Sequence, residues 1–106
     1  MPKYLIHASY TAEGLRGLQK DKASGRQQAV RQVLESVGGR LECVYYAFGQ
    51  DDVVIIADLP DNVAASAISL TVSAAGLVRT RTTPLMTVDE VDKALAAKID
   101  YRKPGG

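Results

Sequence analysis

The segment Val53–Ala57 constrains the fold most, because it places five apolar residues in a row between Gly49–Asp52 and Pro60. Successive side chains of a β-strand point to opposite faces of the sheet, so an unbroken apolar run predicts a strand that is buried on both sides. A chain of 106 residues forms one domain. Its own helices can cover one face, and we expect a second copy of the chain or a ligand to cover the other.

The composition is that of an ordinary globular protein, with 46% hydrophobic and 24% charged residues. Thirteen basic and twelve acidic side chains give a net charge of +1, which provides no general attraction for nucleic acid or for an anionic membrane. The single cysteine, Cys43, excludes an intrachain disulfide and a multi-cysteine zinc site. We therefore expect no metal, cofactor, nucleic-acid or membrane partner. We also expect a cytoplasmic protein, because no signal sequence or membrane-length segment is visible.

Apolar periodicity and turn residues predict the elements of the chain. The predicted strands are Tyr4–Tyr10, Arg40–Phe48, Val53–Leu59 and Leu77–Leu85. After the first strand we predict a short helix capped by Thr11, a bend over Gln19–Gly25 and a stronger helix that ends at Gly38-Gly39. A further helix is predicted from the cap Asp61 to Ala75. A last helix is predicted over Val88–Ile99, and a capping box at Thr87 begins it. Residues 1–100 then form the domain, and residues 101–106 a flexible tail.

This order predicts an α+β fold, a ferredoxin-like βαββαβ sandwich with an extra C-terminal helix. The first and third strands are central, and both main helices lie on one face of a four-stranded antiparallel sheet. Each valine or isoleucine left in water on the other face forgoes about 1.5 to 3 kcal/mol, against a typical net stability of roughly 5 to 15 kcal/mol. Dimerisation of two sheets, or the last helix folding back, would cover that face.

One residue and four short segments form a further pattern: Tyr4, Thr11–Gly14, Gly38–Leu41, Gly49–Asp52 and Val78–Thr83. This pattern resembles that of the GYD domain family, and the likeness extends over most of residues 3–92. The resemblance implies a ferredoxin-like fold of the dimeric α+β-barrel type, with largely undetermined activity and no established catalytic residue. The tyrosine of the motif that names the family is replaced here by Asp51, while Gly49 and Asp52 are kept. A role for that tyrosine therefore does not carry over.

His7 is the candidate catalytic residue, since it lies mid-strand on the face away from the helices and a histidine suits proton transfer near neutral pH. The alternative is a histidine that is hydrogen-bonded within a subunit interface. Arg79 and Arg81 share one face of the fourth strand and suit bidentate recognition of a carboxylate, although a solvated edge or an intersubunit ion pair explains them as well. The full set of candidate ligand-binding residues is Ser9, Tyr10, Tyr45, Tyr46, Arg79 and Arg81.

Two other chemical groups are read as structural. Cys43 is expected to be a small buried hydrophobic residue, because nothing local stabilises its thiolate. Asp51-Asp52 is expected to be a solvated turn.

Three classes of function remain open. The first is a homo-oligomeric module that binds a small anionic or aromatic molecule between its sheets. The second is a small cofactor-independent enzyme, similar to monooxygenases, isomerases or dehydratases, that uses His7 as acid or base. The third is a regulatory interaction domain whose last helix docks on a protein partner.

Overall fold

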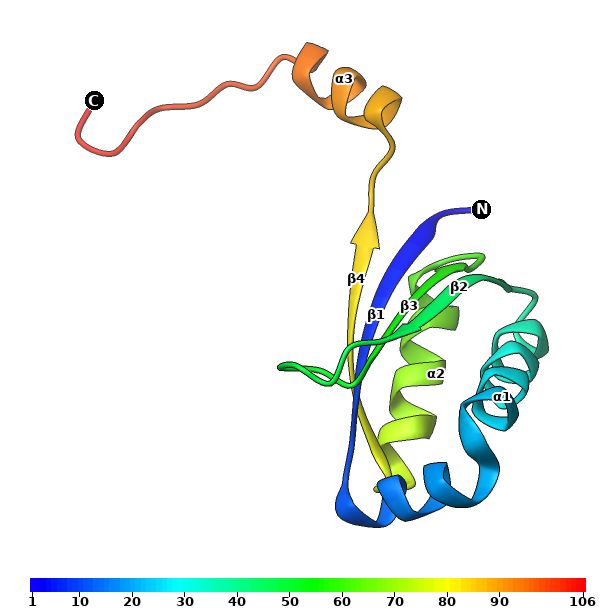
Figure 1. Ribbon diagram of the computed structural model, residues 1–106. Helices are drawn as coiled ribbons and strands as arrows, with labels where there is room; N and C mark the ends of the chain where they lie inside the picture. The colour runs from blue at the N-terminus through cyan, green and yellow to red at the C-terminus, as the bar shows by residue number, and fades with distance from the viewer.

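The computed structural model describes residues 1–106, which form a four-stranded sheet, two helices packed on it and a third helix that stands apart (Figure 1). The elements are β1 (Lys3–Tyr10), α1 (Ala12–Ser36), β2 (Arg40–Tyr46), β3 (Val53–Asp58), α2 (Asn62–Ala74), β4 (Val78–Leu85) and α3 (Val88–Ala96). This order confirms the predicted βαββαβ arrangement with a C-terminal helix.

The strand order in the sheet is β2-β3-β1-β4, and every neighbouring pair is antiparallel. The central positions of β1 and β3 are as predicted. Helices α1 and α2 lie on the same face of the sheet, α1 mainly over β2 and α2 over β4 (Figure 1). The fold is therefore a ferredoxin-like α+β sandwich with one covered and one open face.

The hydrophobic core lies between this sheet and the two helices. It consists of Tyr4, Ile6 and Ala8 of β1, Val53, Ile55 and Ala57 of β3, Leu59, and Leu34 and Ala65 of the helices. The Tyr4 hydroxyl donates a hydrogen bond of 2.6 Å to Asn62 Oδ1, which satisfies the polar end of a buried ring. Side chains of even number on β1 and odd number on β3 thus face the helices.

Helix α1 begins where expected, because the Thr11 hydroxyl accepts a hydrogen bond from the Gly14 N–H at 3.1 Å. The predicted bend is narrower than Gln19–Gly25: only Lys22, with φ 66° and ψ 166°, leaves the helical conformation. Gly14 in the first turn of α1 is required by close packing. A Cβ on it would lie 2.1 Å from the Leu77 carbonyl oxygen, so only glycine lets this turn approach the start of β4.

Strand β2 ends at Tyr46, two residues before the predicted Phe48, which adopts φ 52° in the connection to β3. A bulge between Leu41 and Cys43 adds Glu42 as an extra residue opposite β3. The alternation of side chains consequently changes phase in the middle of β2.

Helix α3 begins with the predicted capping box, in which Glu90 N–H donates to Thr87 Oγ1 and Thr87 N–H donates to Glu90 Oε1. The helix ends at Ala96, so its predicted extension to Ile99 is wrong. None of its residues is buried. Figure 1 shows α3 and the tail projecting beyond the end of β4, away from the rest of the molecule.

Candidate functional site on the open face of the sheet

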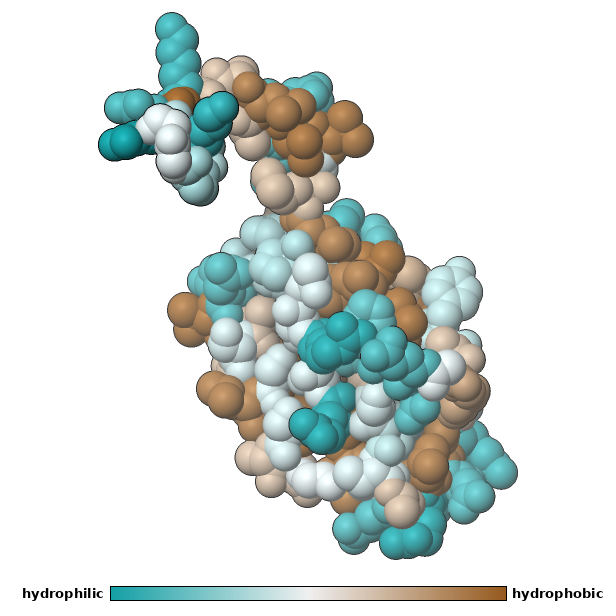
Figure 2. Space-filling model, turned by 90° about the vertical axis from the view of Figure 1, so that its left-hand side faces the viewer, coloured by the Kyte–Doolittle hydropathy of each residue, from teal (hydrophilic) through white to brown (hydrophobic).

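The open face of the sheet carries a half-buried apolar strip. Val54 and Ile56 of β3 and Leu5 of β1 lie on this face and are all half-buried, whereas their helix-facing neighbours are buried. Figure 2 shows the face: hydrophobic side chains gather toward the end that joins α3, and hydrophilic side chains occupy the centre. We call this surface the open face.

A polar cluster lies at the hairpin end of the open face. The antiparallel register places Ser9 opposite Arg79 and His7 opposite Arg81. Arg81 Nη2 lies 2.5 Å from Asp51 Oδ2, and the Ser9 hydroxyl donates to Asp51 Oδ1 at 3.1 Å. The Arg81 guanidinium lowers the pKa of Asp51, and Ser9 assists. Arg81 is thus neutralised within the chain.

Arg79 is the arginine of this strand that stays available. Its exposed side chain shares the open face with Arg81, and a shallow hollow of about 250 Å³ is lined by Ser9, Asp51, Thr80 and both arginines. Since Asp51 balances the charge of Arg81, Arg79 gives the hollow a net positive charge. An anion is the ligand this hollow suits.

The hairpin acidic residues are not a solvated turn. Asp51 and Asp52 are both half-buried, because the hairpin folds against β1. Asp52 N–H donates to the Ala8 carbonyl, and the Tyr10 N–H donates to Asp52 Oδ2, both at 2.9 Å. The expectation of solvated side chains is therefore wrong: these carboxylates tie the hairpin to the end of β1.

His7 lies at the middle of the open face, between Val54 on one side and Arg81 on the other. Its Nδ1 atom is buried without a hydrogen-bond partner. The nearby Ser9 hydroxyl is already bound to Asp51, so it is no ready nucleophile. Cys43 is half-buried on the same face, and no group of three side chains that could ligate a metal is present.

The three candidate tyrosines do not come together. Tyr45 lies on the open face, opposite Val54, and is 69% exposed. Tyr10 and Tyr46 lie on the other side of the sheet, where they line a cavity under the helices. Tyr46 also stacks on Phe48, with ring centroids 5.8 Å apart. The predicted ligand-binding set is consequently divided between two faces of the sheet.

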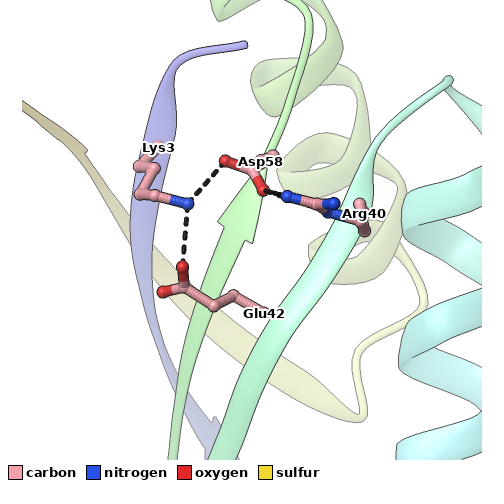
Figure 3. A network of polar contacts seen from close by, with 4 residues as sticks. All are labelled: Lys3, Arg40, Glu42 and Asp58. Carbon is pink, nitrogen blue, oxygen red and sulfur yellow. Dashed lines mark hydrogen bonds and ion pairs between the residues drawn. The ribbon is translucent and has the colours of Figure 1, made fainter.

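Sequence reasoning missed a charged network at the opposite end of the open face (Figure 3). Asp58 is only 4% exposed, and Lys3 and Arg40 contact its two carboxylate oxygens at 2.8 and 2.9 Å. Lys3 also contacts Glu42 at 2.8 Å. Hydrogen bonds from Lys3 and Arg40 lower the pKa of Asp58, against the opposing effect of burial. Antiparallel alignment of the predicted strands would have placed these charges opposite one another.

The fold and this face define a ferredoxin-like α+β domain whose sheet is covered on one side only. The chain belongs to the GYD domain family, whose sequence model matches residues 4–95. No curated protein and no solved structure matches the chain. None of the helices combines the length and the apolar character needed to cross a membrane.

Proposed function

We propose that this protein works as a homo-oligomer in which two open faces pack together, α3 of each chain packs on the other chain, and the space between the sheets binds a small anionic or aromatic molecule. Such a pairing is isologous: the same surface of both copies meets around a two-fold axis. It corresponds to the dimeric α+β-barrel arrangement that the family resemblance implies.

The observation that carries the proposal is helix α3. Val88, Val91 and Leu95 are all exposed, the first and last at 79% and 78%. A helix of nine residues is marginal in water unless its apolar side packs on something. The capping box sets where α3 begins, but it cannot replace packing. A surface outside this chain's own core therefore has to stabilise α3.

The open face supplies a matching surface on a second copy. Leu5, Val54 and Ile56 form a strip of half-buried apolar side chains on the open face. Covering each of them completely contributes on the order of 1 kcal/mol, and two copies double the total. Self-association would thus bury both the apolar side of α3 and the apolar strip of the open face.

The small-molecule part of the proposal is supported by Arg79, His7 and Tyr45. Arg79 presents a cation that no acid of the chain neutralises, His7 has an unpartnered Nδ1, and Tyr45 presents an exposed ring on the same face. Between two sheets these groups would surround a low-dielectric space. A carboxylate with an aromatic body satisfies all three.

Sedimentation velocity of the full chain at micromolar concentration tests the assembly. We expect a dimer or larger oligomer, and we expect Leu95→Asp to shift it toward monomer because a charge is placed in the apolar interface. Val63→Asp is the matched control: Val63 is 77% exposed on α2, away from the proposed interface. A compact wild-type monomer, or equal effects of both variants, would overturn the proposal.

Titration with benzoate tests the ligand. We expect binding to the oligomer, and about a tenfold loss with Arg79→Gln because a charged hydrogen-bonding partner is removed. Arg16→Gln on the exposed side of α1 is the control. Unchanged affinity in Arg79→Gln contradicts the assignment of this arginine.

The unpartnered Nδ1 of His7 favours one second candidate, an enzyme that uses this imidazole as acid or base. His7→Gln should then abolish turnover of an anionic substrate while the sedimentation coefficient stays unchanged. Retained turnover in this variant excludes His7 as the acid or base.

A further inference from the structure

A cavity lies on the covered side of the sheet, separate from the open face. Since α1 packs mainly on β2 and α2 mainly on β4, the helix-facing side chains of the central strands border a space of about 90 Å³ between them. Hydrophobic side chains make up most of the lining, among them Ile6, Ile55 and Ile68. Protein interiors are packed to the density of organic crystals, so a space of this size among apolar side chains is unusual.

Two polar atoms at this cavity lack partners. Arg26 of α1 and Thr80 of β4 both line it, and Arg26 Nε and Thr80 Oγ1 are buried without a hydrogen bond. The ion pair of Arg26 with Asp21 joins Nη1 to Oδ2 at 3.8 Å and leaves Nε unused. Buried donors without partners are rare in native proteins. Their position points to an acceptor that enters the cavity.

The charge of the lining is set by Arg26 alone. Tyr10 and Tyr46 bring hydroxyl groups to the cavity, but burial, together with the neighbouring Tyr10 hydroxyl, raises the pKa of Tyr46 to about 12. Tyrosine is neutral at physiological pH even with its ordinary pKa, and the raised pKa of Tyr46 keeps it so. The cavity thus combines an apolar body with one cationic donor, and the Arg26 side chain, 31% exposed, lies toward solvent.

We propose that this cavity binds a small monocarboxylate whose compact hydrocarbon body fills the apolar space and whose carboxylate accepts hydrogen bonds from Arg26. The volume is about three times that of a water molecule in the liquid, which leaves room for a hydrocarbon body of roughly three to four carbon atoms. The Asp21 carboxylate is exposed and lies 3.8 Å from Arg26 Nη1, too far for a hydrogen bond, so the guanidinium stays available to balance one negative charge. A dianionic phosphate would keep an uncompensated charge in apolar surroundings.

The probe is 3-methylbutanoate, added to the full-length protein and followed through the methyl NMR signals. We expect saturable shifts at Ile6, Ile55 and Ile68, which line the cavity. The neutral amide of the same skeleton should bind at least about tenfold more weakly, because it offers no charge to Arg26. The comparison of acid and amide uses the wild-type protein alone, so no substitution can disturb the fold. Equal affinity for acid and amide overturns the proposal, as do shifts confined to Leu5, Val54 and Ile56 on the open face.

Variants test the assignment of the residue. Arg26→Gln should weaken binding of 3-methylbutanoate about tenfold, and Arg31→Gln, an exposed arginine on the same helix, should leave it unchanged. Val72→Phe on α2 should abolish binding by filling the space. Unfolding transitions of each variant report whether it is folded. Equal loss in Arg26→Gln and Arg31→Gln, or retained binding in Val72→Phe, contradicts the cavity as the site.

Discussion

Strand β3 presents similar apolar residues to both faces of the sheet, but the two faces are covered to different extents. On β3, Val53, Ile55 and Ala57 are at most 6% exposed, whereas Val54 and Ile56 between them stay half-buried. Connectivity causes the difference: both crossover helices lie on the same side of the sheet. A strand's composition therefore shows that both faces need cover, and the topology shows which one the chain can cover by itself.

Ile55 and Ile56 give the strongest test of this comparison. Ile55→Ala should cost about 3 kcal/mol of unfolding free energy, because it opens a cavity in the core. Ile56→Ala should cost about 1 kcal/mol in the monomer and more as protein concentration rises, since self-association buries this side chain. Urea denaturation at two protein concentrations measures both. Equal costs, independent of concentration, would mean that the faces do not differ.

Replacement of Asp58 tests how much a buried charge stabilises the edge of the open face. Asp58→Asn should cost about 1 to 2 kcal/mol at pH 7, because Lys3 and Arg40 lose a buried acceptor but remain accessible to water. The folded-state pKa of Asp58 is lowered, so its stabilisation is present above the ordinary carboxyl range near pH 4 and is lost as the pH falls through the folded-state value.

The difference between wild type and Asp58→Asn should accordingly shrink in acid. Denaturant unfolding of both proteins at pH 7 and pH 3 measures this, with Asp92→Asn on exposed α3 as the control. A difference that is constant across this range would show that the Asp58 charge contributes nothing.

Thr11 caps α1, which packs on the sheet, and Thr87 caps α3, which has no buried residue. Replacing each threonine therefore compares a packed helix with an unpacked one. Thr11→Ala should cost about 1 kcal/mol of monomer stability, because α1 packs on the sheet. Thr87→Ala should leave monomer stability nearly unchanged but weaken self-association about fivefold, because α3 is stabilised only in the oligomer. Denaturation and sedimentation equilibrium separate the two effects. A loss of monomer stability in Thr87→Ala would place α3 within the monomer's cooperative unit.

Replacement of Asp51 should have a smaller effect, on the affinity of the open face for benzoate. Asp51→Asn removes the partner of Arg81 and should tighten benzoate binding to the open face roughly two- to threefold, a modest change because exposed ion pairs contribute little. Isothermal titration against wild type measures it. Weaker binding in this variant would show that the carboxylate positions Arg81 for the ligand instead of competing with it.

Local patterns predicted most of the fold. The three caps at Thr11, Asp61 and Thr87 depend on neighbouring residues only, and all are confirmed. The end of α3 was predicted too late, at Ile99, because this residue continues the apolar spacing of the helix beyond its last turn.

The site was harder to predict. The Ser9–Asp51–Arg81 cluster depends on how a hairpin folds against β1, a contact across 42 residues of chain. Tyr10 and Tyr46 share a residue type with Tyr45 but point to the other side of the sheet. For Tyr45 and Tyr46 the opposite orientation follows from alternation on one strand. The bulge at Glu42 hid only which of the two tyrosines faces the helices, because it changes the phase of alternation in β2.

Because of the bulge at Glu42, strand β2 can lose one residue and still pair with β3 in the same register. Deleting one residue within a strand normally inverts the orientation of every side chain beyond it. Here Arg40 and Leu41 already alternate correctly with Cys43 and Val44 across the extra residue, so removing Glu42 leaves a regular strand with the same pairing to β3. Only the contact with Lys3 disappears, and its partner Asp58 remains (Figure 3). The deletion should give a folded protein with little change in its melting temperature, whereas deletion of Val44 should not.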